Sequence, residues 1–299
     1  MSSAPSTLHR SLELAGTLPA LMVAADRVAA TVIQGVHGRR RVGQGDAFWQ
    51  YRPYREGDSA SQIDWRQSAR SRHLFVRETE WEAAASVWLW RDASPSMQYA
   101  SLRNIDTKAV RAELLTLALA SLLADAGERV AVLGGGMRPT SGRVAVRRLA
   151  ETLFDETRDT TRTPPSLPPL VPLPAHGTIV LVSDWLDPLD KIEAVIRHYA
   201  SGGVRGHLVQ VLDPAEEDLP FDGHVKFEGL EAEGQHTIRR VEAVRTAYGA
   251  RLAAQKEGLQ RLTRPADWTV HMHRTDRPPQ TVLLALYLAM ADLRRLNAA

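Results

Sequence analysis

The sequence predicts an α/β protein with a doubly wound, mostly parallel sheet, and two features of the chain support this fold class. After residue 85, short apolar runs alternate with longer amphipathic runs, as strands and helices do around a parallel sheet. Before residue 85, glycines separate short segments rich in Trp, Tyr, Phe and Arg, which is typical of short strands and turns. We therefore predict an α/β domain over residues 85–299 and a smaller N-terminal subdomain, a helix followed by strands, over residues 1–84.

Five segments of the larger domain are short and apolar on both faces, as buried parallel strands are. They are Ser86–Arg91, Arg129–Leu133, Thr178–Ser183, His207–Leu212 and Trp268–His273. Amphipathic segments predict the helices that connect and follow these strands. They are Ile105–Asp125, Val144–Phe154, Pro188–Ala200, His236–Leu262 and Pro279–Leu296, with an earlier helix over Leu18–Gln34 in the N-terminal part.

Two segments interrupt this alternation. The turn Gly134-Gly135-Gly136 precedes a short segment that we expect to be a brief edge strand. Six of the twelve residues from Thr163 to Pro174 are proline, which excludes a helix and an interior strand alike. This segment is expected to be an extended surface connector that leads to the strand at Thr178.

Composition limits the chemistry and the location of the protein. The 299 residues include no cysteine, which excludes disulfides, thiolate nucleophiles, iron–sulfur clusters and cysteine-bound zinc. The segment Met1–Arg10 lacks a secretory signal pattern. The most apolar run, Thr281–Met290, has roughly half the length of a membrane-spanning helix. We therefore predict a cytoplasmic protein without a membrane span.

Oxygen-bearing side chains follow the first predicted strand of the larger domain. Asp92, Ser94 and Ser96 alternate after that strand, and Asp184 follows the strand that ends at Ser183. Ligand sites of open parallel sheets lie beyond the carboxyl ends of the strands. Carboxylates and hydroxyls are hard ligands that suit Mg²⁺ or a similar divalent cation. The alternative is structural: Ser96 caps the next helix and Asp92 pairs with a basic neighbour.

These motifs resemble known ones. Asp-x-Ser-x-Ser-Met with a later Ser-Asp strand end is similar to the metal-ion-dependent adhesion site of von Willebrand A domains, which have a Rossmann-type fold. The sequence that precedes this motif resembles the bacterial family catalogued as domain of unknown function fifty-eight. The residues that carry this second resemblance are Arg52, Tyr54, Gly57, Asp58, Ile63, Asp64, Trp65, Ser68, Ala69, Arg70, Glu78 and Glu80.

The resemblance implies a set of metal ligands. Asp92, Ser94, Ser96 and Asp184 match the motif, and such a site usually adds a threonine from an intervening loop. Thr140 is the residue we assign to this role. Thr161 and Thr163 are alternatives, because the proline-rich segment replaces the short helix that normally follows the threonine.

The matching residues of the N-terminal part have two interpretations. In the first, Ile63 and Trp65 pack as core, while Asp64, Arg66 and Arg70 form an ion-pair network that anchors this part to the larger domain. In the second, the block around Arg52, Tyr54, Gly57 and Asp58 is a surface for a partner. We expect the architectural role.

The family resemblance implies a function in protein interaction. It predicts a non-enzymatic, chaperone-like adaptor that joins a MoxR-type AAA+ ATPase to an unknown client and contacts a partner carboxylate through the metal. Catalytic motifs do not compete with this prediction: Ser94 and Ser96 lack a Gly-x-Ser-x-Gly elbow, and Gly134–Gly136 is not followed by Gly-Lys-Ser/Thr.

The alternative function is nucleic-acid binding. Arginines of residues 39–77 are interleaved with aromatic residues, and the sequence pI is near 9. Acidic residues at positions 46, 56, 58, 64, 78 and 80 interrupt any continuous basic stripe. We therefore expect a protein rather than a nucleic acid as the partner.

Overall fold

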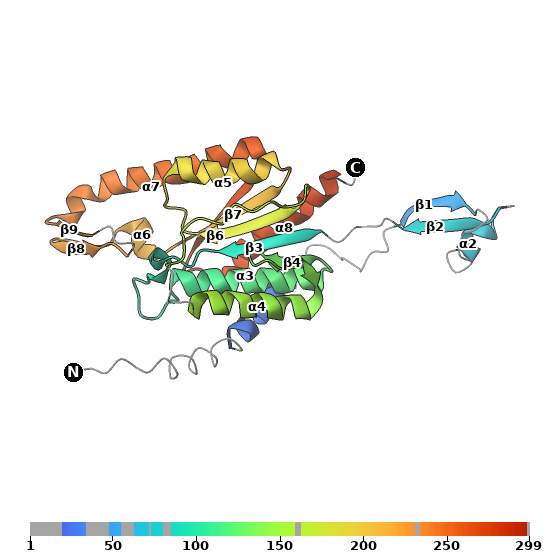
Figure 1. Ribbon diagram of the computed structural model, residues 1–299, viewed down its shortest axis with the longest axis horizontal. Coiled ribbons are helices and arrows are strands. Elements are labelled where there is room, and N and C mark those ends of the chain that lie inside the picture. Colours follow the sequence, from blue (N-terminus) through green and yellow to red (C-terminus); the bar gives the residue numbers. More distant parts are fainter. Residues whose placement is uncertain are drawn as a thin grey trace. The chain divides into compact units, whose positions relative to one another are not determined.

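The computed structural model describes residues 20–33, 48–54, 63–71, 73–79, 85–158, 163–230 and 234–297. The chain forms two compact units: one comprises residues 36–84, and the other comprises residues 1–35 together with residues 85–299. Figure 1 shows their helices and strands and labels most of them.

The larger unit is built on a six-stranded sheet with the strand order β10-β7-β6-β3-β4-β5. All neighbouring strands are parallel except the short edge strand β5, which runs antiparallel to β4. The strands are β3 (Ser86–Arg91), β4 (Arg129–Val132), β5 (Thr140–Ser141), β6 (Thr178–Ser183), β7 (Arg205–Leu212) and β10 (Thr269–Arg274). A mostly parallel sheet was predicted, and its strands lie within two residues of the predicted bounds.

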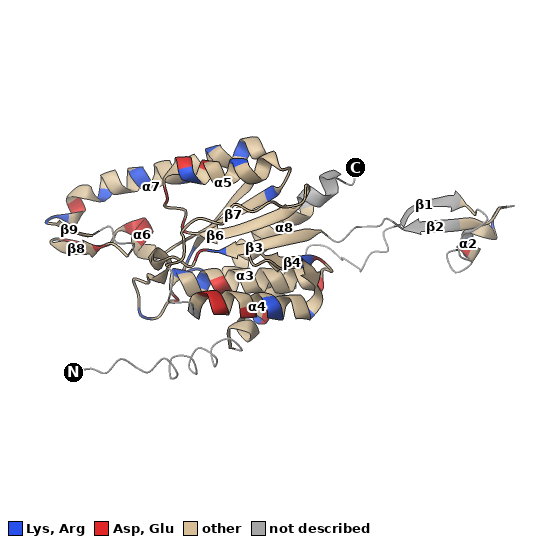
Figure 2. Ribbon diagram, in the orientation of Figure 1, with Lys and Arg blue, Asp and Glu red and all other residues tan. Residues whose placement is uncertain are grey.

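Helices cover both faces of this sheet, which makes the unit a mixed α/β structure as predicted (Figure 1). One apolar core joins the sheet to a helix over residues 20–33 and to α3 (Lys108–Asp125), α4 (Gly142–Arg158) and α8 (Pro279–Asn297). The second core joins the opposite face to α5 (Leu189–Ser201) and α7 (Val241–Thr263). Charged residues gather on outer helices such as α4 and α7, while the central strands are largely apolar (Figure 2).

The helix over residues 20–33 belongs to the larger unit. Its side chains Ala25, Val28 and Val32 are buried in the core with α3 and α8, and Ser121 donates a hydrogen bond of 2.9 Å to Asp26. We had predicted that residues 1–84 form one subdomain. The structure differs because this helix buries its apolar face in the core of the larger unit.

Several small elements of the larger unit were not predicted. They are η2 (Pro95–Gln98), α6 (Pro214–Asp218), the antiparallel pair β8 (Val225–Glu228) and β9 (Gln235–Ile238), and η3 (Arg264–Ala266). The predicted helix over His236–Leu262 is therefore wrong at its start. Residues 235–238 pair with β8, so α7 begins only at Val241.

The proline-rich segment has no helix or strand from residue 163 to residue 174, as predicted. Leu167, Val171 and Leu173 pack against the core on the α5 side of the sheet. The Tyr199 hydroxyl donates to the Pro169 carbonyl and accepts from the Val171 amide at 3.3 Å. The connector is therefore held to α5 at Pro169 and Val171.

The smaller unit contains the antiparallel strands β1 (Phe48–Pro53) and β2 (Phe75–Thr79) and the single-turn helix α2 (Trp65–Ser68). The Ser68 hydroxyl donates to the Asp64 carbonyl at 2.8 Å and accepts from the Phe75 amide at 2.9 Å. These two hydrogen bonds of Ser68 join α2 to β2. The prediction that Trp65 packs as core is wrong, since the side chain is 65% exposed because it projects from a single turn of helix.

The buried face of the helix over residues 20–33 gives a stability prediction. Val32→Ala should lower the free energy of unfolding by about 1–3 kcal/mol, because it opens a cavity next to α3 and α8. Val23 lies on the same helix but is 50% exposed, so Val23→Ala should change the free energy of unfolding by less than about 0.5 kcal/mol. Denaturant titrations of both variants measure the difference. Equal effects would contradict the packing of this helix on the larger unit.

Candidate functional site

The candidate site lies at the topological switch point of the sheet. Strand β3 has β4 on one side and β6 on the other, so the chain leaves β3 in one direction and later returns on the opposite side. The loops after β3 and β6 therefore separate at their carboxyl ends, where open α/β sheets bind ligands. The loops carry Asp92 and Asp184, respectively.

Asp92 lies at the bottom of the site and is fully buried. Its amide donates to the Val182 carbonyl at 2.8 Å; its Oδ1 accepts from the Ser94 amide and its Oδ2 from the Ser183 hydroxyl, both at 2.7 Å. Burial raises the pKa of Asp92 to about 6, although the hydrogen bonds from Ser94 and Ser183 oppose this shift. The side chain thus cross-links the loops after β3 and β6.

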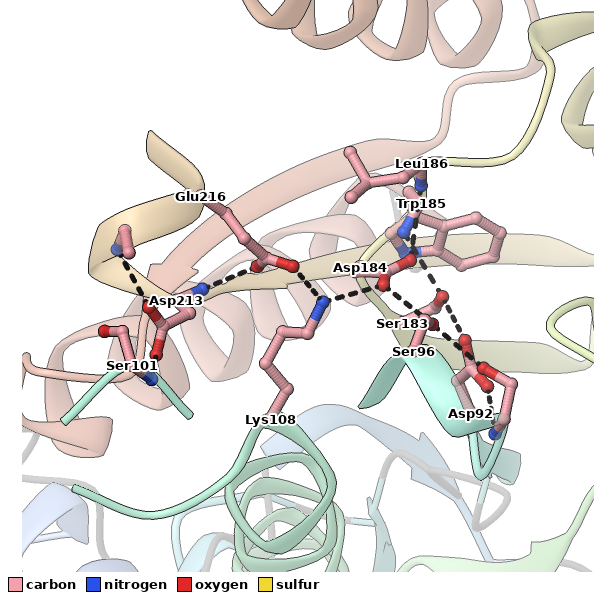
Figure 3. Close-up of polar contacts among 12 residues, drawn as sticks. Asp92, Ser96, Ser101, Lys108, Ser183, Asp184, Trp185, Leu186, Asp213 and Glu216 are labelled. Carbon is pink, nitrogen blue, oxygen red and sulfur yellow. Dashed lines mark hydrogen bonds and ion pairs between the residues drawn. The ribbon is translucent and has the colours of Figure 1, made fainter. Parts of the chain in front are cut away.

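The two serines of the motif lead from Asp92 to Asp184. The hydroxyl oxygens of Ser94 and Ser96 are 3.1 Å apart, and the Ser96 hydroxyl donates to Asp184 Oδ2 at 3.0 Å (Figure 3). Ser96 lies inside η2, and its side chain bonds to the neighbouring strand end rather than capping a helix. The structure therefore brings together the four residues that the motif predicted at this edge of the sheet.

Lys108 was not predicted, and it stands at the centre of the cluster. Its ammonium donates to Asp184 Oδ2 at 2.9 Å and to Glu216 Oε1 at 2.5 Å, and the residue is fully buried (Figure 3). Burial favours loss of its proton, but Asp184 and Glu216 more than offset this, so the pKa of Lys108 is raised. The one available sequence signal was a lysine beginning an apolar helix in a chain with only four lysines.

Glu216 connects the cluster to a third strand end, that of β7. Asp213 caps α6 by accepting from the Ala215 amide at 2.8 Å, and Glu216 Oε2 accepts from the Asp213 amide at 2.9 Å. Asp213 also accepts from the Ser101 amide at 2.9 Å. Burial raises the pKa of Glu216, while Lys108 opposes the shift. The loops after β3, β6 and β7 are therefore tied together.

Trp185 fixes the backbone that carries Asp184. Its φ of 52° is in the left-handed region, which is rare for a bulky residue and marks local strain. The buried indole donates to the Val209 carbonyl at 3.1 Å, Gln210 donates to the Asp184 carbonyl at 2.7 Å, and Gln255 donates to the Trp185 carbonyl at 2.9 Å. These bonds hold the strained turn in one conformation.

A pocket of about 810 Å³ opens beside the cluster. Ser96 and Asp184 line it together with residues of the loops after β6 and β7 and of β8. Its aromatic and charged lining residues are Tyr99, Phe221, Phe227, Tyr248, Asp187, Lys191, Glu216, Lys226 and Glu228. The proline connector contributes Ser166, whose hydroxyl donates to Asp187 Oδ1 at 3.0 Å. Such a mixture of apolar surface and a few polar groups is typical of binding pockets.

The assignment of Thr140 as a ligand is wrong. Thr140 pairs with Val130 at the start of β4, and Val130 lies beside Val87 at the start of β3. Asp92 follows the opposite end of β3, because β3 and β4 are parallel. Thr163 is exposed in the connector, and Thr161 lies outside the described residues.

The family-specific residues of the N-terminal part lie in the smaller unit. Arg52 pairs through its backbone with Val76, while its side chain is outside the description. The Tyr54 amide donates to the Leu74 carbonyl at 2.8 Å, and Arg70 is exposed. Gly57 and Asp58 lie outside the described residues. The anchoring role stays a prediction.

The donor groups of the cluster do not fit a divalent metal ion in the observed arrangement. Both oxygens of Asp92 already accept hydrogen bonds, and Asp184 Oδ2 accepts from Ser96 and Lys108. Within the described ranges, no group of three or more His, Cys, Asp or Glu side chains is placed to hold an ion. Each Asp92 oxygen keeps a second lone pair, but Asp184 Oδ2 already accepts two donors, one of them an ammonium, so Mg²⁺ would have to displace one of them to bind there. The observed geometry therefore supports a function in which a bound metal ion has no part.

Comparison with known proteins gives the family of the chain. Residues 50–258 match the family described as a protein of unknown function, DUF58, and the chain belongs to this family. Uncharacterised proteins of Mycobacterium tuberculosis and Mycobacterium bovis are each 26% identical to it over 301 residues, covering 92% of both chains. The resemblance predicted from the motifs is thus confirmed at the level of the family.

One solved structure corrects the predicted location. It is titled an uncharacterised membrane-spanning protein from Vibrio fischeri; it is 14% identical, with a TM-score of 0.18, and the match covers 70% of this chain and 98% of that one. Its title contradicts the prediction of a cytoplasmic protein, which we withdraw. A TM-score this low supports no argument about fold. Among the helices that the structure describes, none is long and apolar enough to cross a membrane.

The raised pKa of Asp92 predicts a pH dependence of stability. Between pH 4 and pH 6 the unfolded chain has lost this proton and the folded chain retains it, so stability falls as the pH rises. The total loss of stability from this group is roughly 3 kcal/mol, and it is complete once the pH exceeds the pKa of Asp92 in the folded chain. Asp92→Asn should remove this part of the pH dependence, which urea titrations at several pH values measure. If the free energy of unfolding changed with pH in the same way for the wild-type chain and for Asp92→Asn, the raised pKa of Asp92 would be contradicted.

Proposed function

We propose that this chain is a non-enzymatic adaptor that binds a partner protein at the pocket beside Ser96 and Asp184. The observation that carries the proposal is the pocket itself, which opens at the switch point of the sheet and combines aromatic, apolar and charged groups. Binding pockets of this size place a few oriented polar groups within a largely apolar surface. Ser96 and Asp184 are the oriented polar groups here.

The hydrogen bonds of the two serines support a binding role rather than catalysis. A serine nucleophile needs a general base, usually a histidine, within hydrogen-bonding reach. The contacts of Ser96 are Ser94 and Asp184, and Asp184 is itself paired with the Lys108 ammonium. A carboxylate held by an ammonium is a poor base for a hydroxyl proton. These serines therefore act as hydrogen-bonding groups.

The motif geometry also supports assignment of the larger unit to the von Willebrand A-like class. Asp92, Ser94 and Ser96 follow β3, Asp184 follows the adjacent β6, and the four side chains form one hydrogen-bonded series. The resemblance of these motifs implies the partner that we propose, a MoxR-type AAA+ ATPase, together with a client protein.

Nucleic-acid binding is the less favoured function. Four carboxylates line the pocket (Asp184, Asp187, Glu216 and Glu228), and they would repel a phosphate backbone there. Nucleic-acid binding by the arginine-rich N-terminal segment stays a prediction. Retention of nucleic acid that falls steeply with salt concentration would support it.

A charge placed at the mouth of the pocket should weaken partner capture. Leu186 lines the pocket and is 43% exposed, so Leu186→Glu should leave the fold intact and reduce capture of the MoxR-type ATPase by about tenfold or more. Leu170 is 54% exposed on the connector and does not line the pocket, so Leu170→Glu is the matched control. Pull-down with the purified ATPase, at equal stability of the variants, measures the ratio.

The outcomes of this experiment separate the possibilities. Loss of capture with Leu186→Glu but not with Leu170→Glu supports the pocket as the docking site. Equal capture by the wild-type chain and both variants would remove the pocket from the proposed function. Failure of the wild-type chain to bind the ATPase would remove the partner.

A further inference from the structure

We infer that Lys108 supplies the cation of this site, so that the cluster of Asp92, Ser96 and Asp184 works without a divalent metal ion. The inference goes beyond the proposed function, because it concerns the chemistry of the site and not the identity of the partner. The motif resembles a metal site, but the Asp184 oxygen that faces Ser96 already accepts from the Lys108 ammonium.

The position of the ammonium is the first argument. Asp184 Oδ2 accepts both the Ser96 hydroxyl, at 3.0 Å, and the Lys108 ammonium, at 2.9 Å (Figure 3). A metal ion bound to Asp184 Oδ2 would therefore share this oxygen with the Lys108 ammonium, so the two positive charges would be close neighbours. Repulsion between like charges at such a separation is strong in a buried site. The lysine and a divalent ion compete for one carboxylate oxygen.

The remaining carboxylate oxygens are the second argument. Asp92 Oδ1 and Oδ2 accept from Ser94 and Ser183, and Asp184 Oδ1 accepts from the Leu186 amide at 3.3 Å. Each oxygen therefore has a donor within the protein. A carboxylate oxygen has two lone-pair positions, and those of Asp184 Oδ2 are taken by Ser96 and Lys108. A metal bound to this oxygen would have to displace one of these donors and leave it without its partner, which costs free energy.

The placement of Lys108 in α3 is the third argument. It occupies the first turn of an 18-residue helix, where the positive end of the helix dipole disfavours a cation. It is also fully buried, which disfavours an ammonium further unless it is paired. Asp184 and Glu216 come from two other loops and supply both pairings. The fold thus provides an anionic cradle that matches an ammonium.

The experiment compares ion binding by the wild-type chain and by Lys108→Met, which keeps the length of the side chain and removes its charge. Calorimetric titration with Mn²⁺ should give no saturable binding to the wild-type chain, and its melting temperature should be the same in EDTA and in millimolar Mg²⁺. Lys108→Met leaves Asp184 and Glu216 facing one cavity without a cation. This variant should have a lower melting temperature in EDTA and regain several degrees on addition of Mn²⁺.

Lys256→Met is the matched control. Lys256 also pairs with a glutamate of α6, Glu217, but the pair is partly exposed and lies outside the cluster. This variant should show no stabilisation by Mn²⁺. If Lys108→Met does not fold, the double variant Lys108→Met/Glu216→Gln removes one carboxylate together with the ammonium and should fold in EDTA. Its Asp184, no longer paired with a cation, should then give Mn²⁺-dependent stabilisation that Lys256→Met lacks.

Saturable binding of one Mn²⁺ to the wild-type chain, abolished by Ser96→Ala, would overturn the inference. A folded Lys108→Met variant that gains no stabilisation from Mn²⁺ would overturn it as well. These measurements need no partner, so they are independent of the pull-down experiment.

Discussion

The ion pairs of Lys108 with Asp184 and Glu216 are the constraint on which the candidate site depends. A single ammonium contacts carboxylates from the loops after β6 and β7, and its own helix follows β3. Three chain segments that are distant in sequence therefore share one buried charge. Because an unpaired buried ion is costly, these ion pairs stabilise the three segments against one another.

This arrangement follows from the way in which the sheet is covered. Helix α3 is buried on almost every side, since it packs against the sheet, α4 and α8. Its first residue consequently faces the interior at the carboxyl ends of the strands. The position of Lys108 is thus set by the packing of an apolar helix, and the carboxylates of the neighbouring loops make that position tolerable.

The sequence predicted those parts of the structure that depend on local pattern. Strands β3 and β6 have the predicted bounds, because each is apolar on both faces, and Asp92, Ser96 and Asp184 converge because parallel strands end at one edge. Lys108 and Glu216 were missed because their contact joins segments 108 residues apart and leaves no periodic signal. Thr140 was misassigned since spacing alone does not give strand register. Strands β8 and β9 were missed because they are short and half exposed.

The connector over residues 163–174 has a consequence for the affinity of the pocket that it borders. Proline fixes the backbone angle φ in the unfolded chain as well as in the folded one, so little conformational entropy remains to be lost when this segment becomes ordered. Its fastening to Tyr199 and Asp187 adds to this rigidity. The wall that contains Ser166 is therefore preorganised, and a ligand that meets it retains more of its binding free energy than it would against a flexible loop.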